Sequence, residues 1–271
     1  MGTTISVVIP AVNEALWIER AVRSARAAGV NEILVVDGRS DDATVKLAQN
    51  SGARVLVGSR GRAAQQNLGA QHAQGDILLF LHADNWLAPE TGQQIRACCR
   101  NQEVLGGALV QRIEASGRLY RWLERGNAAR VRWRGLAYGD QAIFMRSSTF
   151  QQLGGFPPVK LMEDVLLMRA FRRLARPVLL AGPVYVHARR WQRRGVVRQT
   201  LCNWTLLTAQ AVGVAPDWLA RFYPSHDSPS ASLAASGTQP SGASIAANSS
   251  MGKPITLDSL PSTTCNHPDR S

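Results

Sequence analysis

The stretch LLFLHADNW, Leu78 to Trp86, joins an apolar strand to a polar end. Its first four residues are large and apolar, which is typical of a strand covered on both faces of a sheet. The run ends abruptly in His82, Ala83 and Asp84. In an open parallel sheet, ligands bind outside the carboxyl ends of the strands. The stretch therefore predicts a central strand that ends in functional groups.

Apolar runs and helical patterns alternate around this stretch. Strands are predicted over 5–9, 32–36, 53–57 and 77–81, with helices after N-caps at Asn13 and at Ser40 or Asp41, and over 62–73 and 89–100. This alternation indicates an α/β fold with a mostly parallel central sheet flanked by helices. Beyond Gly106 the pattern loosens, with strands expected over 108–113, 141–145, 178–180 and 184–186 and helices over 119–129 and 163–174.

The composition changes at Ser225. The rest of the chain is rich in Ser, Ala, Gly and Pro and nearly lacks large apolar residues. Such a segment buries too little surface to offset the entropy of ordering. We expect one folded domain over 1–224 and a disordered tail over 225–271.

Hydrophobic and charged contents of 45% and 18% are typical of a soluble globular protein. Neither a run of 18 apolar residues nor a secretory signal is visible, so we expect a cytoplasmic protein. The four cysteines form no CxxC pair, which favours a reducing compartment and argues against a zinc site.

The formal net charge of +12 requires either an acidic partner or a solvated basic face. Much of it lies over 118–134 and among the arginines of 189–198. Nucleic acid, an anionic membrane and phosphorylated substrates are the partners of matching charge. The apolar-leaning helix predicted over 195–214 either packs on the core or lies at an anionic membrane surface, which would give peripheral membrane contact.

Polar clusters follow three of the predicted strands. They are Pro10 to Glu14, Asp37 to Asp41 and His82 to Asp84, and we expect them to meet at one edge of the sheet. Carboxylates there can bind a nucleoside or a hard cation such as Mg²⁺ or Mn²⁺. No glycine-rich phosphate loop is present, so a diphosphate would need a metal and basic side chains. Arg60 and Arg62 are candidates, unless they are plain surface arginines.

Seven segments carry a resemblance to a known family. In order they are SVVIPAVNE, ILVVDGRSDDAT, GRAAQQNLGA, GDILLFLHAD, YGDQAIFMRSSTFQQLGGFP, LMEDVLLMRAFRRL and ARRWQRRG. From about Ser6 to Tyr223 the chain resembles the family 2 glycosyltransferases, and more narrowly the compact bacterial subgroup with HAD in place of DxD. The resemblance implies a GT-A fold and transfer of a sugar from a nucleotide-diphosphate sugar to an acceptor hydroxyl.

The resemblance also implies roles for the donor side of the site. Pro10, Asn13 and Glu14 would line the nucleoside pocket, and Asp37 would contact the base. Asp84 would hold a divalent metal, Mn²⁺ or Mg²⁺, on the diphosphate. His82 replaces the first aspartate of the DxD triplet, which usually contacts the ribose, and an imidazole can make the same hydrogen bond.

Glu163 and Asp164 form the second key pair. Paired acids at a helix start are also favoured by the helix dipole alone. The resemblance implies that Asp164 is the general base of an inverting transfer, since a carboxylate must reach the attacking hydroxyl. It implies that Glu163 shapes the acceptor site.

The remaining candidates lie later in the chain. Asp140 would contact the donor sugar or cap a strand. Arg190 would neutralise the diphosphate and Trp191 would stack on a sugar or acceptor, as the family's QxxRW motif implies. His187 stands at the glutamine position of that motif and is either a metal ligand or a structural residue.

Two other functions remain as alternatives. A nucleotidyltransferase would use a similar sheet, but it usually has a glycine-rich loop that PAVNEA does not resemble. A non-catalytic nucleotide- or nucleic-acid-binding module would suit the charge. The chain lacks the aromatic pattern of such modules, so we expect no nucleic-acid partner. The sequence leaves the sugar, the base and the acceptor open, with a lipid-linked acceptor among the options.

Overall fold

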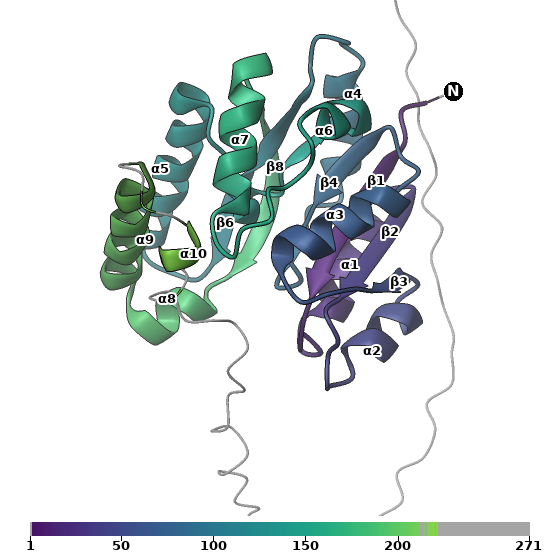
Figure 1. Ribbon diagram of the computed structural model, residues 1–271, viewed down its shortest axis with the longest axis horizontal. Helices are drawn as coiled ribbons and strands as arrows, with labels where there is room; N and C mark the ends of the chain where they lie inside the picture. The colour runs from purple at the N-terminus through teal and green to yellow at the C-terminus, as the bar shows by residue number, and fades with distance from the viewer. Residues whose placement is uncertain (1, 212–213, 215, 220, 222–271) are drawn as a thin grey trace, which may run out of the picture. The chain divides into compact units, whose positions relative to one another are not determined.

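An eight-stranded mixed sheet carries the fold, in the order β3-β2-β1-β4-β7-β6-β8-β5 (Figure 1). The computed structural model describes residues 2–211, 214, 216–219 and 221, with some side chains beyond residue 189 left out. The strands are β1 (Ile5–Ala11), β2 (Glu32–Asp37), β3 (Arg54–Val57), β4 (Ile77–Phe80), β5 (Asn85–Leu87), β6 (Gly106–Glu114), β7 (Phe144–Arg146) and β8 (Val178–His187).

The first half of the sheet is parallel, as the sequence predicts. Strands β3, β2, β1 and β4 all run in the same direction, with Ala11 opposite Asp37 and Val8 opposite Phe80. Every residue of β1 is buried, and alternate residues enter different apolar clusters on the two sides of the sheet. The carboxyl ends of β1, β2 and β4 therefore lie at one edge.

The second half is mixed. Strand β7 is antiparallel to β4 and β6, β8 is parallel to β6, and β5 is antiparallel to β8. Strand β5 was not predicted from the sequence, since three residues are too few to show a period. Only four residues separate β4 from β5, yet three strands lie between them in the sheet. The sheet must curl for so short a segment to join its middle to its edge.

Helices cover both sides of the sheet. One apolar cluster joins it to α1 and α4, and the other joins it to α3, α5, α6 and α7. The helices are α1 (Ile18–Ala27), α2 (Thr44–Asn50), α3 (Arg62–His72), α4 (Thr91–Cys99), α5 (Arg118–Arg134), α6 (Ser147–Gln152), α7 (Glu163–Leu174), α8 (Arg189–Arg194), α9 (Val196–Ala211) and α10 (Pro216–Leu219), with a 3-10 turn at Gly139–Gln141.

Two predicted helix caps were wrong. Helix α1 begins at Ile18, five residues after Asn13, because the chain first turns at Glu14, whose carbonyl accepts the Ile18 N–H. Helix α2 begins at Thr44, and neither Ser40 nor Asp41 caps it. These polar side chains instead connect the two loops, as described below.

Two predicted strands also differ in extent. The strand expected over 141–145 is β7, and Gln141 belongs to the 3-10 turn before it. The strands expected over 178–180 and 184–186 are one strand, β8, whose register with β6 shifts opposite Gly182 and Pro183. Proline lacks the N–H of a ladder bond, so the sequence pattern breaks there although the strand continues.

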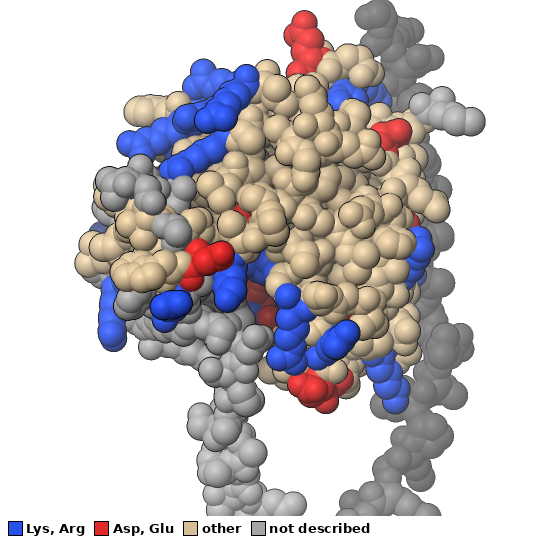
Figure 2. Space-filling model, viewed as in Figure 1, with Lys and Arg blue, Asp and Glu red and all other residues tan. Residues whose placement is uncertain are grey.

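The C-terminal helices pack on the start of α7. Leu206 of α9 and Leu219 of α10 form a cluster with Leu161, Met162 and Val165. The tail predicted over 225–271 lies outside the described residues. Among the described residues, no helix is both long and apolar enough to cross a membrane. Basic side chains form separate groups on the face seen in Figure 2.

Candidate active site

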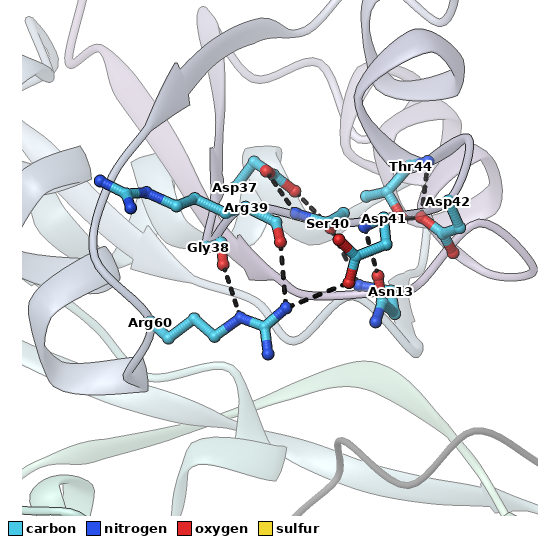
Figure 3. A network of polar contacts seen from close by, with 9 residues as sticks. All are labelled: Asn13, Asp37, Gly38, Arg39, Ser40, Asp41, Asp42, Thr44 and Arg60. Atoms are coloured by element: carbon cyan, nitrogen blue, oxygen red, sulfur yellow. Dashed lines mark hydrogen bonds and ion pairs between the residues drawn. The ribbon is translucent and has the colours of Figure 1, made fainter.

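The loops after β1 and β2 are joined by side-chain hydrogen bonds (Figure 3). The Asn13 N–H donates to Ser40 Oγ at 2.9 Å, and Asn13 Oδ1 accepts the Asp41 N–H at 2.9 Å. Arg60 donates to the carbonyl oxygens of Gly38 and Arg39, both at 3.1 Å, and pairs with Asp41. Arg60 therefore positions the loop of the predicted nucleoside pocket.

Asp37 is the last residue of β2 and begins the second of these loops. Its side chain is 2% exposed, and its two oxygens accept the Ser40 hydroxyl at 2.5 Å and the Ser40 N–H at 2.9 Å. Next to it, Gln65 of α3 donates to the carbonyl oxygens of Ala11 and Val36, at 2.9 and 2.7 Å. Gln65 ties the ends of β1 and β2 together, so Asp37 lies in a fixed position.

Arg189 joins two carboxylates that follow different strands. Its Nη2 lies 2.9 Å from Oε1 of Glu14 and 2.9 Å from Oδ2 of Asp84. Glu14 follows β1, Asp84 follows β4 and Arg189 begins α8 after β8. The pKa of Arg189 is raised: burial acts against the cation, but the two carboxylates outweigh it. Sequence reasoning assigned no role to this arginine and selected its neighbour Arg190.

His187 lies beside this ion pair. Its N–H points to the Asp84 carbonyl at 3.4 Å, and its ring lies 4.2 Å from the ring of Trp17, centroid to centroid. Burial lowers the pKa of His187, and the nearby Arg189 adds to this effect. The Arg189 N–H donates to His187 Nδ1 at 3.1 Å. The lowered pKa and this hydrogen bond to Nδ1 both favour the neutral imidazole.

A divalent metal fits this corner only together with a ligand. The described residues contain no group of three His, Cys, Asp or Glu side chains that could hold a metal ion. Sites for Mg²⁺ commonly use one or two carboxylates and complete the shell with substrate phosphates and water. Asp84 can supply such a carboxylate if Arg189 releases it. His187 can add a nitrogen only if its contact with the Arg189 N–H opens.

The sequence-predicted His82 and Asp164 come together around Gly139. A methyl group on Gly139 would lie 2.7 Å from Nε2 of His82 and 3.2 Å from Oδ2 of Asp164. The Gly139 N–H donates to Asp164 Oδ2 at 2.5 Å. Three segments distant in the sequence therefore meet at Gly139. One of them carries His82, which lies two residues before Asp84 in the chain.

Glu163 is buried beside Asp164 at the start of α7. Arg62 of α3 binds it through two contacts, Nε to Oε1 at 2.8 Å and Nη2 to Oε2 at 3.3 Å. Desolvation raises the pKa of Glu163 to about 7, Arg62 opposes the rise and Asp164 adds to it. Arg62, expected near the diphosphate, is thus found at the acidic pair.

Asp140 ends a chain of polar contacts that runs from α5. Arg130 donates to Asn127 at 2.8 Å, Asn127 to Gln111 at 2.6 Å and Gln111 to Asp140 Oδ2 at 2.7 Å. Asp140 Oδ1 is buried and has no hydrogen-bond partner among the described residues. A buried carboxylate oxygen of this kind is costly unless a water or a ligand donates a hydrogen bond to it. Nothing in the sequence pattern marked the residues behind it.

Left-handed backbone conformations at residues other than glycine concentrate in these loops. Among the described residues they are Asn13, Arg39, Ala142 and Met162, with φ of 54°, 62°, 46° and 65°. Asn13 is itself a candidate residue, Met162 precedes Glu163, and the other two lie two residues after Asp37 and Asp140. Such strain costs free energy and is kept where the surrounding structure and function require it.

The other two late candidates differ in position. Trp191 is 9% exposed and packs with Ile113, Val186 and Ala188, with its ring 6.4 Å from that of Tyr120. Packing accounts for this tryptophan, and its stacking on a sugar stays a prediction. The side chain of Arg190 lies outside the described part of the chain.

The sheet has acidic loops at its carboxyl edge, and an acidic pair begins α7. This arrangement is the one expected of a GT-A glycosyltransferase. The profile of the family described as glycosyl transferase family 2 matches residues 6–199. The chain belongs to this family, which confirms the resemblance found in the sequence.

Relatives and solved structures agree with this assignment. An uncharacterized glycosyltransferase of Rickettsia bellii (strain RML369-C) is 36% identical over 92 residues, which are 34% of this chain and 31% of that relative. S. aureus TarS superposes with a TM-score of 0.56 and 18% identity, over 72% of this chain and 38% of TarS. The match therefore spans about a third of the length of these proteins.

A second structure is similar over more of its own length. Glucosyl-3-phosphoglycerate synthase from Mycobacterium tuberculosis, in complex with Mn²⁺, UDP and glucosyl-3-phosphoglycerate, has a TM-score of 0.51 and 24% identity, over 69% of this chain and 71% of that one. At these identities the likeness shows the fold, which is the GT-A fold that the sequence predicted.

Proposed function

We propose that the protein is a metal-dependent inverting glycosyltransferase that moves a sugar from a nucleotide-diphosphate sugar to an acceptor hydroxyl. The observation that carries the proposal is the convergence of His82 and Asp164 on Gly139. Asp84 follows His82 by two residues in the chain. This convergence supports a single site with one carboxylate for a metal–diphosphate, Asp84, and one for a hydroxyl, Asp164. Family membership supports the same reaction.

The donor would bind along the carboxyl ends of β1, β2 and β4. Pro10, Asn13 and Asp37 would surround the nucleoside, and the fixed loops after β1 and β2 suit a base of defined shape. Related structures in complex with UDP-GlcNAc and with UDP make uridine nucleotides the first to test. Asp140, with its unpaired oxygen, would accept a hydrogen bond from a sugar hydroxyl.

The diphosphate would lie against Asp84. A Mn²⁺ or Mg²⁺ held by Asp84, with or without His187, would supply positive charge for the leaving nucleoside diphosphate. Arg189 already places one cation at Asp84 and would turn to the phosphates when Asp84 binds the metal. Arg190 stays a further candidate for the diphosphate. His82 would donate a hydrogen bond to the ribose or a phosphate.

Asp164 would act as the general base. Two backbone N–H groups, from Gly139 and Val165, hold its carboxylate at 2.5 and 2.8 Å, so its orientation is fixed at little entropic cost. It would take the proton of the acceptor hydroxyl as that oxygen attacks the anomeric carbon from the side opposite the diphosphate, which inverts the configuration. Glu163, held by Arg62, would form the wall of the acceptor site.

Two substitutions separate binding from turnover. Asp84→Asn should abolish the thermal shift that a nucleotide sugar gives with Mn²⁺, whereas Asp164→Asn should keep the shift and lose at least about a hundredfold in turnover. The measurements are melting curves with a panel of nucleoside diphosphates and nucleotide sugars, and release of nucleoside diphosphate. Glu103→Gln, at an exposed carboxylate, is the control.

Two results would contradict this proposal. Normal binding and turnover in both variants would remove the roles of Asp84 and Asp164. Release of pyrophosphate in place of nucleoside diphosphate would identify a nucleotidyltransferase. The acceptor, with a lipid-linked alcohol among the candidates, is to be found by product analysis with the wild-type protein.

A further inference from the structure

The solvent-facing side of α5 combines tryptophan, leucine and arginine. Leu119, Trp122 and Trp133 are 55%, 71% and 82% exposed. Exposed arginines stand seven residues apart at Arg118, Arg125 and Arg132. With 3.6 residues per turn, all six side chains fall on one side of the helix. We call these six residues the outer face of α5.

The inner side of the same helix is fully occupied. Val131 is buried against the sheet, and Glu124 is 4% exposed. Arg112 and Arg121 bind the Glu124 carboxylate at 3.1 and 3.0 Å. Since Glu124 is the only acid of α5, the outer face carries no negative charge. Packing against the described residues does not account for the two exposed tryptophans.

The C-terminal end of α7 extends this surface. Leu174 is 44% exposed and follows the exposed Arg172 and Arg173. Arg172 donates to the carbonyl oxygen of Arg134 at 2.9 Å, so the two helix ends are in contact. Figure 2 shows a group of basic side chains at the upper left, over the ends of α5 and α7 in Figure 1.

The geometry points to the outer face of α5 as a docking surface for an anionic lipid membrane, on which the helix lies flat. Tryptophan and leucine enter the boundary between headgroups and acyl chains, and arginine pairs with anionic headgroups while its stem stays apolar. The helix is about 25 Å long, so the contact extends over several lipids. This surface lies on a different helix from α9, which the sequence left either packed on the core or at a membrane surface. The inference does not depend on the proposed function.

Two other partners fit the face less well. A second copy of the chain would bring arginines against arginines. Single-stranded nucleic acid stacks on aromatic rings within a basic groove, whereas Trp122 and Trp133 protrude from a helix. Charge and apolar content together therefore favour the membrane.

Vesicle sedimentation tests the inference with the full chain. We expect the wild-type protein to bind vesicles of phosphatidylglycerol and phosphatidylcholine in equal amounts, but not vesicles of phosphatidylcholine alone. Replacing Arg118, Arg125 and Arg132 by Gln should weaken binding about a hundredfold. Trp122→Ala with Trp133→Ala should weaken it at least about tenfold.

Matched variants separate this face from general charge and apolarity. The control for charge replaces three exposed arginines elsewhere, Arg23, Arg54 and Arg100, by Gln. The control for apolar surface is Val57→Ala with Trp218→Ala, at residues 63% and 51% exposed. Both controls should bind anionic vesicles as the wild type does. The nucleotide-induced thermal shift, which reports the proposed function, should be unchanged in all four variants.

Several outcomes would overturn the inference. They are equal binding of the wild type to both kinds of vesicle, equal losses in the variants and their controls, and full binding by the double tryptophan variant. Loss of binding to a single-stranded RNA, instead of vesicles, in the α5 variants would assign the face to nucleic acid. A dimer that dissociates in these variants would assign it to a second copy of the chain.

Discussion

Arg189 shows how one side chain organises the donor side of the site. Its guanidinium lies 2.9 Å from both Glu14 and Asp84, whose side chains are 14% and 9% exposed. Two carboxylates so close together and so little exposed need a cation. In the absence of a ligand the cation is the arginine, and a metal–nucleotide complex would have to replace it at Asp84.

Arg189→Gln tests this exchange. The substitution leaves Glu14 and Asp84 without their shared cation, so we expect a loss of about 3 kcal/mol in the free energy of unfolding. Millimolar Mn²⁺ should restore part of the loss in the variant and change the wild type little, because the metal enters the place of the guanidinium. Urea denaturation with and without Mn²⁺ measures both effects. Arg189→Lys, which keeps a charge, is the control, and an equal response of variant and wild type to Mn²⁺ would refute the exchange.

Glu163 makes stability depend on pH. The unfolded carboxyl titrates near 4.5 and the folded one near 7, so the folded state favours the protonated form. Its contribution to stability is fully present below pH 4.5 and is lost as the pH rises through 7. The Glu163→Gln variant has no carboxyl group at this position, so its stability does not fall in this way as the pH rises. Between pH 5 and 8 the variant should therefore gain about 3 kcal/mol of unfolding free energy relative to the wild type.

Denaturant titrations at several pH values measure this difference. Glu103→Gln removes a carboxylate that is exposed, so its curve should run parallel to that of the wild type. Arg62→Gln should move the loss to higher pH, since Arg62 lowers the pKa of Glu163. If the curves of Glu163→Gln and the wild type were parallel, the burial of Glu163 would not govern its titration.

Among the elements, the 3-10 turn at Gly139–Gln141 brings the two halves of the site together. It follows α5, touches the segment after β4 through His82 and holds Asp164 of α7. Any side chain at Gly139 would force its neighbours to move, because its first carbon would lie 2.7 Å from Nε2 of His82. The close approach of three elements thus depends on a glycine.

Gly139→Ala should separate the two sides of the site. The added methyl group would push His82 or Asp164 away, so turnover should fall at least about tenfold while the fold remains. Gly126→Ala is the matched control, since no atom lies within 4 Å of the added carbon there. As a helical alanine, it should raise stability by about 0.5 to 1 kcal/mol. Full turnover in Gly139→Ala would show that the approach is not needed.

Whole-molecule comparison shows which features the sequence could predict. The parallel half of the sheet and helix α7, which begins at Glu163 as predicted, have patterns set by their own burial and termini. Strand β5 and the continuity of β8 depend on partners across the sheet, which no local period reveals. Asn13 and Ser40 look like helix caps in the sequence because their side-chain oxygens can accept a backbone N–H. In the fold these oxygens accept N–H groups of the neighbouring loop instead.

Site residues follow the same rule. Asp84, Asp164 and His82 were selected as candidates from their motifs, and the structure brings His82 and Asp164 together. Arg189 and Gln111 were not, because an arginine or a glutamine gains its role from the partner that folding supplies. Arg62 was expected at the diphosphate, and the fold pairs it with the buried Glu163.

The four residues from Leu81 to Asp84 must reach from the middle of the sheet to its outermost strand. Within this segment the Asn85 N–H donates to the His82 carbonyl oxygen at 3.1 Å and closes a tight turn. An insertion or deletion there would therefore shift β5 out of register with β8. Relatives of this protein should vary this segment by exchange of side chains, never by length.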